Sequence, residues 1–462
     1  MLKWRAISLT TAVAALSMTA VTGTQERRGG RLGRAVDPSQ FMVPARAVDV
    51  LVARPTSTTL TLSLLADQSG EVELRYEPGN IRRRVVLAAG VPTDLELDGL
   101  SPDRDYRYTV TGIGDAPVTG GFRTARATGK AFSFAVQADS HLDDNTDVAL
   151  YRRTLANIAE EGHDFLVDLG DTFMTDKYSR FSDALPQYRA QRHFLGSVGR
   201  TMPVFLVLGN HDGETGWPVR GGDGMREWSR DTRTRFFPPV RANAFYRAGP
   251  PTAAYASWTW GDARFIVLDP FTQSTNRPGQ AGDGWAWTLG RVQYAWLAET
   301  LRASTSPYTF VFSHHLVGGR PSLRATEARG GVESAPYFEW GGANADGTSG
   351  MGAKRPGWGP PIHDLLRAHH VTAVFHGHDH VYARQEKDGI AYVAVPQPGH
   401  PRANTRSAAD YGYTSGTVLG GSGHLRVSVA KDRASVEFVR SRLSGANGQV
   451  DDMLAMRPRK AE

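Results

Sequence analysis

Short apolar runs alternate with amphipathic segments after about residue 130, and this alternation limits the fold more than any other feature of the sequence. The runs AFSFAVQAD, DFLVDLGD and MPVFLVLGNHD each end in polar residues, as do the later runs YTFVFSHH and VTAVFHGHDH. Between the first two, VALYRRTLANIAEEG places Leu150, Leu155 and Ile158 on one helical stripe. Strands separated by helices are typical of layered α/β folds, so the sequence predicts an α/β domain over residues 130–440.

Residues 47–125 follow a different pattern, in which apolar and polar residues alternate one by one. The stretches TTLTLSLL, EVELRY, TDLELDGL and DYRYTVTG show this period, with Gly, Pro and Asp between them. Short strands at this spacing predict a small all-β sandwich domain. The stretch RATGK is expected to link it to the α/β domain, and residues 441–462 are expected to form a C-terminal tail.

The N-terminus has the composition of a secretory signal. MLKWR is basic, and AISLTTAVAALSMTAV is uncharged and rich in small residues, so residues 1–23 are expected to be a cleaved signal peptide. The run is shorter than the ~20 apolar residues of a spanning helix, and no other stretch of the sequence reads as one. We therefore expect an exported protein, periplasmic or extracellular, without a transmembrane helix after cleavage. Residues 24–46, rich in Gly and Arg, are expected to be a disordered lead-in.

Composition narrows the chemistry further. The chain has no cysteine, which excludes disulfides and thiolate metal sites. The net charge of +6 includes Lys3 and Arg5 of the predicted signal, and a further arginine excess lies between Gln25 and Arg54. The remainder is near balance, so no dedicated nucleic-acid surface is expected.

Polar residues follow five of the predicted strands, at the point where each strand ends. These residues are Asp139, His141, Asp171, Asn210, His211, His314, His378 and His380. Ligand sites of open α/β sheets lie at the carboxyl ends of strands, so we expect these side chains to share one edge. Carboxylate and neutral imidazole suit Zn, Mn and Fe(II). Each short motif alone is weak, but their combination predicts a metal site.

This set of motifs resembles the calcineurin-like metallophosphoesterases. The family pattern of D-x-H, G-D, G-N-H-D, a histidine that ends a strand and G-H-x-H matches residues 139–141, 170–171, 209–212, 314 and 377–380, in a resemblance that spans roughly 130–430. It implies two stacked sheets flanked by helices, with the site at the strand ends. It also implies two divalent ions (Mn, Zn or Fe) and hydrolysis of phosphate esters by a water that the metal pair activates.

The resemblance also implies a role for each matched residue. Asp171 would bridge the two ions. The first ion would be held by Asp139, His141 and His380, and the second by Asn210, His314 and His378. His211, which is not a ligand in the family, would contact the phosphate or protonate the leaving oxygen.

Two subfamilies match only in part. Residues 47–125 resemble fibronectin type III domains and the N-terminal domain of purple acid phosphatases. Those phosphatases, however, have D-x-G in the first motif and a tyrosine three residues after the bridging aspartate, where this chain has His141 and Met174. Protein Ser/Thr phosphatases have an aspartate at the position of Met174, so neither subfamily describes the site.

Other residues near the motifs have less specific interpretations. His376 is expected to be packed in the core or to support a metal ligand. For His315 two roles are open, which are contact with the substrate and support of a metal ligand. His369 and His370 are interpreted as the end of a helix. The Gly-rich loop over residues 316–358 has an open role, because its polar and aromatic residues are consistent with a substrate pocket or with a surface lid; they are Arg329, Glu333, Glu339 and Trp340.

The sequence thus predicts an exported dinuclear metal phosphoesterase that acts on a small-molecule phosphate ester. A nucleotidase or nuclease with the same site is an alternative, and a non-catalytic envelope binding protein is another. The intact His211 favours an enzyme, because a scaffold has no use for a non-ligand histidine there. The substrate, the choice between monoester and diester, the metals and the oligomeric state are left open by the sequence.

Overall fold

The computed structural model describes Val43, residues 46–219, Gly222, and residues 224–275, 284–319 and 329–459. The signal peptide predicted over residues 1–23 lies outside the described residues, as does nearly all of the lead-in predicted over residues 24–46. Within the described part of the chain, no helix combines the length and the apolar character needed to cross a membrane.

Residues 48–123 form the predicted all-β part. One antiparallel sheet has the order β1-β2-β5 (Val48–Ala53, Leu60–Ala66 and Thr93–Leu97), and the other has the order β4-β3-β6-β7 (Ile81–Leu87, Gly70–Glu77, Asp105–Thr111 and Val118–Arg123). Every second residue of β3 and β6 is buried, as the period-two pattern predicts. Buried side chains of both sheets, such as Leu62 and Tyr106, share one apolar core.

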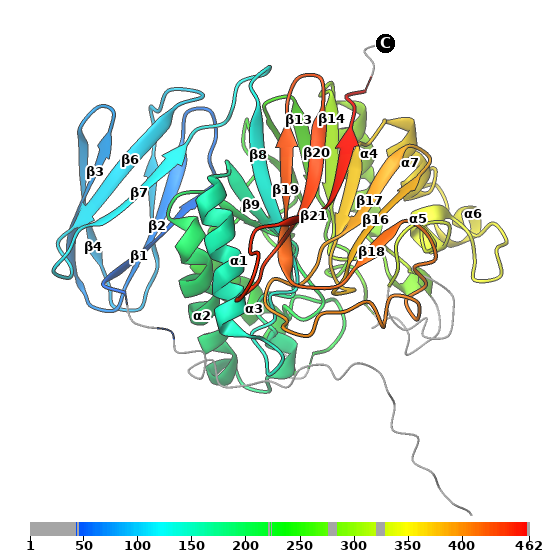
Figure 1. The fold of residues 1–462 in the computed structure, drawn as a ribbon, viewed down its shortest axis with the longest axis horizontal. Helices are drawn as coiled ribbons and strands as arrows, with labels where there is room; N and C mark the ends of the chain where they lie inside the picture. The colour runs from blue at the N-terminus through cyan, green and yellow to red at the C-terminus, as the bar shows by residue number, and fades with distance from the viewer. Residues whose placement is uncertain are drawn as a thin grey trace, which may run out of the picture. The chain divides into compact units, whose positions relative to one another are not determined.

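Two larger sheets stack face to face in the rest of the chain (Figure 1). The six-stranded sheet has the order β10-β9-β8-β19-β20-β21 (Val204–Leu206, Phe165–Asp168, Phe132–Gln137, Gly423–Val429, Ala434–Arg440 and Val450–Met456). The eight-stranded sheet has the order β11-β12-β13-β14-β15-β17-β16-β18 (Arg247–Ala248, Ala256–Trp260, Ala263–Val267, Tyr308–Phe312, Ala373–His376, Ile390–Ala394, Tyr382–Lys387 and Thr417–Leu419). Phe134 of the first sheet contacts Phe265 and Phe310 of the second, with ring centroids 5.1 and 5.6 Å apart, so the inner faces form an aromatic core.

Helices cover the outer faces of both sheets. The helices α1, α2 and α3 (Val148–Glu161, Phe181–Gly199 and Met225–Phe236) lie on the six-stranded sheet, where Ala135 of β8 and Leu166 of β9 turn outward and pack among them. The helices α4, α5, α6 and α7 (Gly290–Arg302, Phe338–Gly341, Met351–Lys354 and Ile362–Ala368) lie on the eight-stranded sheet. The described residues also contain 3-10 turns at Thr175–Lys177 and Gly284–Ala286. The predicted α/β architecture is confirmed.

The six-stranded sheet extends past the domain boundary predicted at residue 440. The segment 441–462, expected as a tail, contains β21, which pairs antiparallel with β20 at the sheet edge. Its sequence VDDMLAM places two aspartates in succession, and only Met456 is buried. An edge strand with one solvated face needs few apolar residues, and the strand pattern is therefore weak.

The sandwich and the α/β part meet at α2, through polar as well as apolar contacts. Arg192 of α2 is fully buried, and its guanidinium donates to Asp49 Oδ2 at 3.0 Å and to Ser63 O at 2.7 Å. Tyr108 of β6 donates to the carbonyl of Arg200 at 2.8 Å, and Leu51 of β1 packs with the apolar side chains around α1 and α2.

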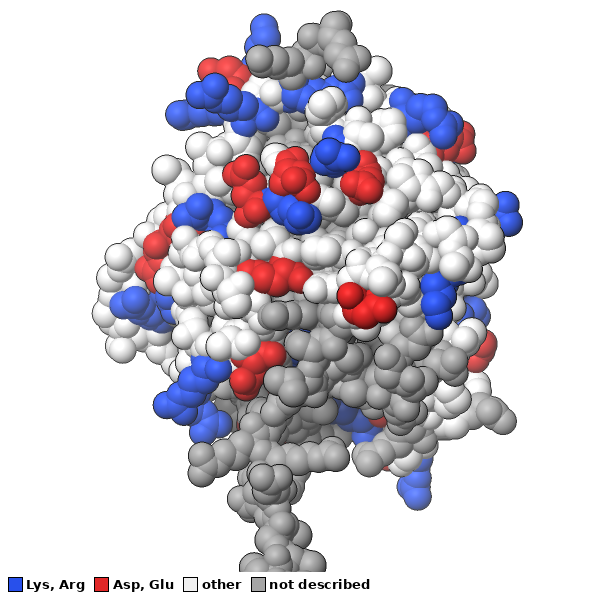
Figure 2. All heavy atoms as spheres, turned by 90° about the vertical axis from the view of Figure 1, so that its right-hand side faces the viewer, with Lys and Arg blue, Asp and Glu red and all other residues white. Residues whose placement is uncertain are grey.

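The distribution of charge can be followed on one face of the molecule. On the face drawn in Figure 2, basic and acidic side chains are interspersed, and each sign occurs beside the other. That face therefore carries no single-sign field among the residues that the structure describes.

Candidate metal centre

Parallel strands carry the predicted site residues to one edge of the stacked sheets. In the six-stranded sheet β8, β9 and β10 run parallel, and in the eight-stranded sheet β13, β14 and β15 do the same. In the six-stranded sheet, β8 ends just before Asp139 and His141, β9 ends before Asp171, and β10 ends before Asn210. In the eight-stranded sheet, β14 ends before His314, and β15 ends before His378 and His380. The structure brings predicted ligands from both sheets together, as the strand-end pattern predicts.

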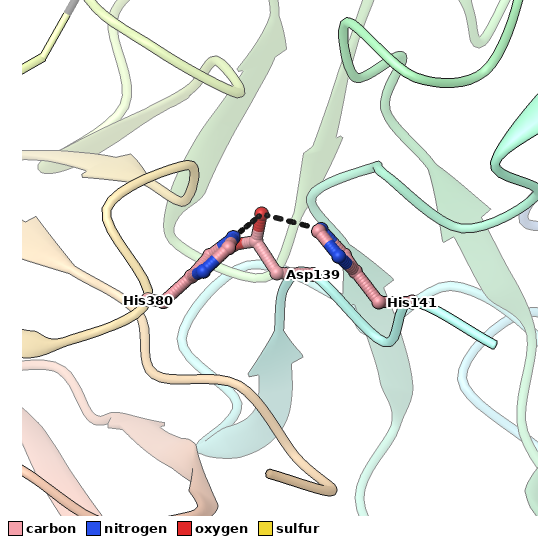
Figure 3. Close-up of side chains that lie close together, drawn as sticks. All are labelled: Asp139, His141 and His380. Atoms are coloured by element: carbon pink, nitrogen blue, oxygen red, sulfur yellow. Dashed lines mark ion pairs between the residues drawn. The ribbon is translucent and has the colours of Figure 1, made fainter. Parts of the chain in front are cut away.

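Asp139, His141 and His380 form the first of two groups at this edge. The Nε2 atoms of His141 and His380 lie 3.5 and 3.4 Å from the same oxygen, Asp139 Oδ1. Figure 3 shows the two imidazoles on either side of that carboxylate, each directed toward it. The three ligand atoms lie within 4.8 Å of one another, which is compatible with a shared ion.

The second group consists of Asp171, His314 and His378, and Asp171 also reaches the first. Its Oδ2 atom lies 3.2 Å from His314 Nε2 and 3.4 Å from His141 Nε2, so one carboxylate oxygen faces a histidine of each group. All three side chains of the second group are buried. The geometry therefore suits the bridging role that the resemblance implies for Asp171.

Unpartnered polar atoms mark the same position. Five of the seven predicted ligands have a buried nitrogen or oxygen without a hydrogen-bond partner; these atoms are Asp139 Oδ1, His141 Nε2, Asn210 Oδ1, His314 Nε2 and His378 Nε2. Buried polar groups without a partner are rare because desolvation is costly. Metal ions would satisfy these atoms, so the residues present fit the metals that the motifs imply.

The backbone at the centre is strained. Five of the predicted ligands have positive φ angles between 35° and 70°, which side-chain-bearing residues rarely adopt; they are Asp139, His141, Asp171, His378 and His380. Such strain persists where the surroundings force it and is concentrated at functional sites. Close backbone approach explains the motif glycines as well. A Cβ on Gly209 would lie 2.1 Å from the amide nitrogen of Asp171, and one on Gly377 would lie 2.7 Å from Asp139 Oδ2.

Charge at the centre favours cations. Burial raises the pKa of Asp171, but the nearby imidazoles of His314 and His211 outweigh it and hold this pKa well below the ordinary value. Burial lowers the pKa of His314, yet the carboxylates of Asp171 and Asp139 raise it to about 9. Two ionised carboxylates in a water-poor site therefore attract positive charge, which a pair of metal ions supplies.

Several further residues support the predicted ligands, and most of them could not be assigned a role from the sequence. Asp212 is buried and accepts from the backbone N–H groups of Asp171, Thr172, Phe173 and Gly209 at 2.7–3.1 Å. Burial and the charge of Asp171 raise the pKa of Asp212 to about 7. The only sequence signal for this residue is its place as the last letter of G-N-H-D. His314 Nδ1 donates to the carbonyl of Leu169 at 2.8 Å, which leaves Nε2 as the free ligand atom.

His211 is at the centre without belonging to either group. Its Nε2 atom lies 4.0 Å from Asp171 Oδ2, and its backbone N–H donates to Asp171 Oδ1 at 2.8 Å. Its Nδ1 atom is 2.8 Å from Asp176 Oδ2, a partner that the sequence did not indicate. The arrangement directs Nε2 toward the carboxylate that the two groups share.

Four other histidines were interpreted from the sequence, and the structure gives their surroundings. His376 is buried at the end of β15, and His369 caps the C-terminal end of α7, followed by His370. His315 is buried against Trp287 and Phe271, with ring centroids 4.2 and 4.5 Å away, and its Nε2 atom has no partner.

In the loop over residues 316–358, some side chains belong to the core and others contact the ligand segments. Glu339 and Trp340 are fully buried, with Glu339 Oε2 accepting from Arg355 at 2.6 Å and Trp340 donating to the Tyr392 hydroxyl at 3.0 Å. These two residues therefore hold the loop rather than a substrate. Arg329 instead contacts the G-H-x-H segment, where it donates to the carbonyl oxygen of His378 at 2.8 Å. Glu333 accepts from Gln385 Nε2 at 2.8 Å.

Comparison with solved structures shows the same fold in two other proteins. The structure of PhoD is similar with a TM-score of 0.64 at 14% sequence identity, over 89% of this chain and 90% of that one. The purple acid phosphatase PPD1 from yellow lupin (Lupinus luteus) seeds is similar with a TM-score of 0.60 at 15% identity, over 88% of this chain and 74% of that one. Comparison with curated protein sequences gives no match.

Family membership follows from the sequence match. A model of the family described as calcineurin-like phosphoesterase matches residues 132–382, which include every residue of both groups. The match begins after the sandwich, so the resemblance of residues 47–125 to fibronectin type III domains stays a prediction. The motifs, the strand-end geometry and the match agree: the chain belongs to the calcineurin-like phosphoesterase family and is a metal-dependent phosphoric ester hydrolase.

Proposed function

We propose that this protein is an exported phosphoesterase that binds two divalent metal ions and hydrolyses small phosphate esters. The observation that carries the proposal is the position of Asp171 between the two groups, with Oδ2 3.4 Å from His141 Nε2 and 3.2 Å from His314 Nε2. In dinuclear hydrolases the ions lie roughly 3.5–4 Å apart, a spacing that a single bridging carboxylate can span. Asn210 Oδ1 is buried and has no hydrogen-bond partner, which supports Asn210 as a further ligand of the second ion.

The proposed ligand sets follow from this arrangement. Asp139, His141 and His380 would hold one ion, while Asn210, His314 and His378 would hold the other, and Asp171 would contribute to both. Nitrogen and oxygen ligands without thiolate favour Mn, Zn or Fe(II). Divalent ions bound there supply Lewis-acid chemistry for an in-line displacement at phosphorus.

His211 has the position of an acid or an oxyanion donor. Asp176 accepts from Nδ1–H at 2.8 Å, so the ring is held with Nε2 facing Asp171. A proton on Nε2 can be donated to the leaving oxygen or to a phosphate oxygen, which stabilises charge as it develops. The same histidine argues against a purely non-catalytic role, because a metal scaffold needs no oriented donor.

Small esters are the proposed substrate class, and the cell envelope or the medium is the proposed location. The near balance of charge over the chain after Arg54 supports a small-molecule substrate over a nucleic acid, which needs a basic track. Export is supported by the basic start and the uncharged, small-residue run within residues 1–23. Cell fractionation checks this, because a version without residues 1–23 should stay in the cytoplasm.

A substrate and metal panel tests the activity. The metal-free full chain is loaded with Mn, Zn or Fe(II) and assayed with p-nitrophenyl phosphate, bis-p-nitrophenyl phosphate, nucleotides and single-stranded DNA. We expect metal-dependent release from the small esters, and Asp171→Asn as the inactive control. Faster turnover of DNA than of any small ester would overturn the substrate class, and activity that survives complete metal removal would overturn the mechanism.

A further inference from the structure

A third group of metal-type ligands lies outside the centre, on the helix-covered face of the six-stranded sheet. Glu161 is the last residue of α1, His163 follows it after one glycine, and His424 is on β19. Their ligand atoms lie within 4.8 Å of one another. None of the three belongs to the motifs, and no step of the proposed hydrolysis uses them.

The geometry of this group is that of a small cation site. Both imidazole Nε2 atoms face a single oxygen, Glu161 Oε2, at 2.7 Å from His163 and 3.1 Å from His424. The side chains of His163 and His424 are almost completely buried, at 1% and 0% exposure, whereas that of Glu161 is 17% exposed. Two buried imidazoles and one carboxylate with access to solvent leave room for a water as the fourth ligand, which is the composition of four-coordinate zinc sites.

Local structure positions each ligand. Gly162 is the C-cap of α1 in the left-handed conformation, with φ of 67°, and this turn brings Glu161 and His163 to the same side. Ser133 Oγ lies 2.9 Å from His163 Nδ1 and can orient that ring, as a supporting partner does in metal sites. For His424, the Nδ1 atom is buried and has no partner, so Nε2 is the nitrogen that faces the group.

The charges around the group are compatible with a divalent ion. Arg426 contacts the other oxygen of the carboxylate, Glu161 Oε1, at 3.3 Å, and so leaves Oε2 to the histidines. The charge of Arg426 is offset by Glu437, which accepts from its Nε at 2.6 Å. One carboxylate and two neutral imidazoles would then face the ion, a donor set that suits Zn²⁺ or Co²⁺.

We propose that Glu161, His163 and His424 bind a divalent cation of the zinc type, separate from the catalytic centre. The ion would join the end of α1 to β19 and to the segment that enters β9. Its role is structural, because its ligands contact none of the predicted catalytic residues. Binding to the folded chain alone stabilises that fold in proportion to metal occupancy.

Metal counting on the full chain tests the proposal. His424→Gln is the matched variant, because glutamine keeps a donor for Glu161 but is a poor metal ligand. After zinc loading and gel filtration, wild type should retain one more equivalent of zinc per chain than His424→Gln, by elemental analysis. Hydrolysis should be unchanged in the variant, and only wild type should gain thermal stability when zinc is added beyond the amount that saturates activity.

A second measurement keeps the test independent of the catalytic centre. In an Asp171→Asn background, Co²⁺ should give the visible bands of a four-coordinate site, and a further His424→Gln or His163→Gln change should remove them. If wild type and His424→Gln bind equal zinc and give identical cobalt spectra, the three residues are a hydrogen-bonded group only and the proposal is wrong.

Discussion

His211 and Asp176 are joined by a hydrogen bond of 2.8 Å between Nδ1 and a carboxylate oxygen. Asp176 lies in the 3-10 turn Thr175–Lys177, directly after the strained residue Met174, so the turn brings its carboxylate to the ring. The bond fixes which nitrogen of His211 faces the centre, because Nδ1 is occupied by Asp176.

His211→Ala is expected to keep both metals and to lower the rate by ~10²-fold or more, because an acid or oxyanion donor is lost. Asp176→Asn should cost less, roughly 10–100-fold, since the ring remains but loses the negative charge that holds it in this orientation. Steady-state kinetics with elemental analysis checks both variants. If the metal content falls together with the rate in His211→Ala, His211 is a ligand and its assigned role is wrong.

Asp171→Asn is expected to abolish hydrolysis and to release metal. An amide oxygen is a weaker ligand than a carboxylate, and the Oδ2 atom faces a histidine of each group, so both ions lose a partner. Elemental analysis after gel filtration measures the loss, with circular dichroism to verify the fold. Full metal content and normal turnover in this variant would contradict the bridging role.

The sequence could assign the predicted ligands to one edge of the sheets because they occupy a recurring place in the strand pattern. Asp139 and His378 each follow an apolar run, and the parallel strands then carry them to one edge. Asp212 could not be assigned in this way, because its role depends on contact with Thr172 and Phe173, about forty residues earlier in the chain. Such contacts between loops leave no periodic pattern.

The same limit explains the other features that the sequence did not reveal. The buried Glu339 accepts a hydrogen bond from the partly buried Arg355 within a Gly-rich loop, where polar residues are expected to be solvated. His424 is 263 residues from Glu161, and an alternating strand pattern does not distinguish its histidine from any other polar residue. His424 is buried because its strand, β19, pairs with β8 in the middle of the sheet. That pairing is a property of the topology and leaves no local pattern in the sequence.

Asp49→Ala is expected to destabilise the protein by about 3 kcal/mol or more, because it leaves the fully buried guanidinium of Arg192 without its carboxylate. Equilibrium urea unfolding measures the change in the free energy of unfolding. Asp67→Ala, an exposed position after β2, is the matched control and should have little effect. Equal stabilities of the two variants would contradict the importance of this contact between the sandwich and α2.

His193 is expected to make stability fall in mild acid. Burial, reinforced by the charge of Arg46, lowers the pKa of His193 from 6.5 to about 4 in the folded chain. The unfolded chain therefore binds the proton more tightly, so this contribution to stability is complete above pH 6.5 and is lost as the pH falls toward 4. His193→Gln should show a shallower decline in the free energy of unfolding over this range. Parallel pH curves for wild type and variant would contradict the shift.

The purified, active protein is expected to show no intense visible absorption band. The band of a purple centre needs a tyrosinate on ferric iron, and the position three residues after Asp171 is Met174, which is buried. His141 in the first group adds a neutral imidazole and thereby favours a pair of divalent ions. Tyr413 is close to the ligand segment, since its hydroxyl donates to Asp379 at 2.7 Å, but burial and that carboxylate raise its pKa well above the ordinary value. It therefore stays a neutral phenol.

Absorption spectra of the Mn-, Zn- and Fe-loaded protein check this, with activity measured on the same samples. Tyr413→Phe is the matched variant, because it removes the hydroxyl and keeps the ring. The spectra of wild type and Tyr413→Phe should coincide for every metal, since no tyrosinate contributes in either. An intense band that tracks the iron content in wild type and vanishes in Tyr413→Phe would mean that this tyrosine reaches the metal, and the neutral donor set derived from His141 would then be wrong.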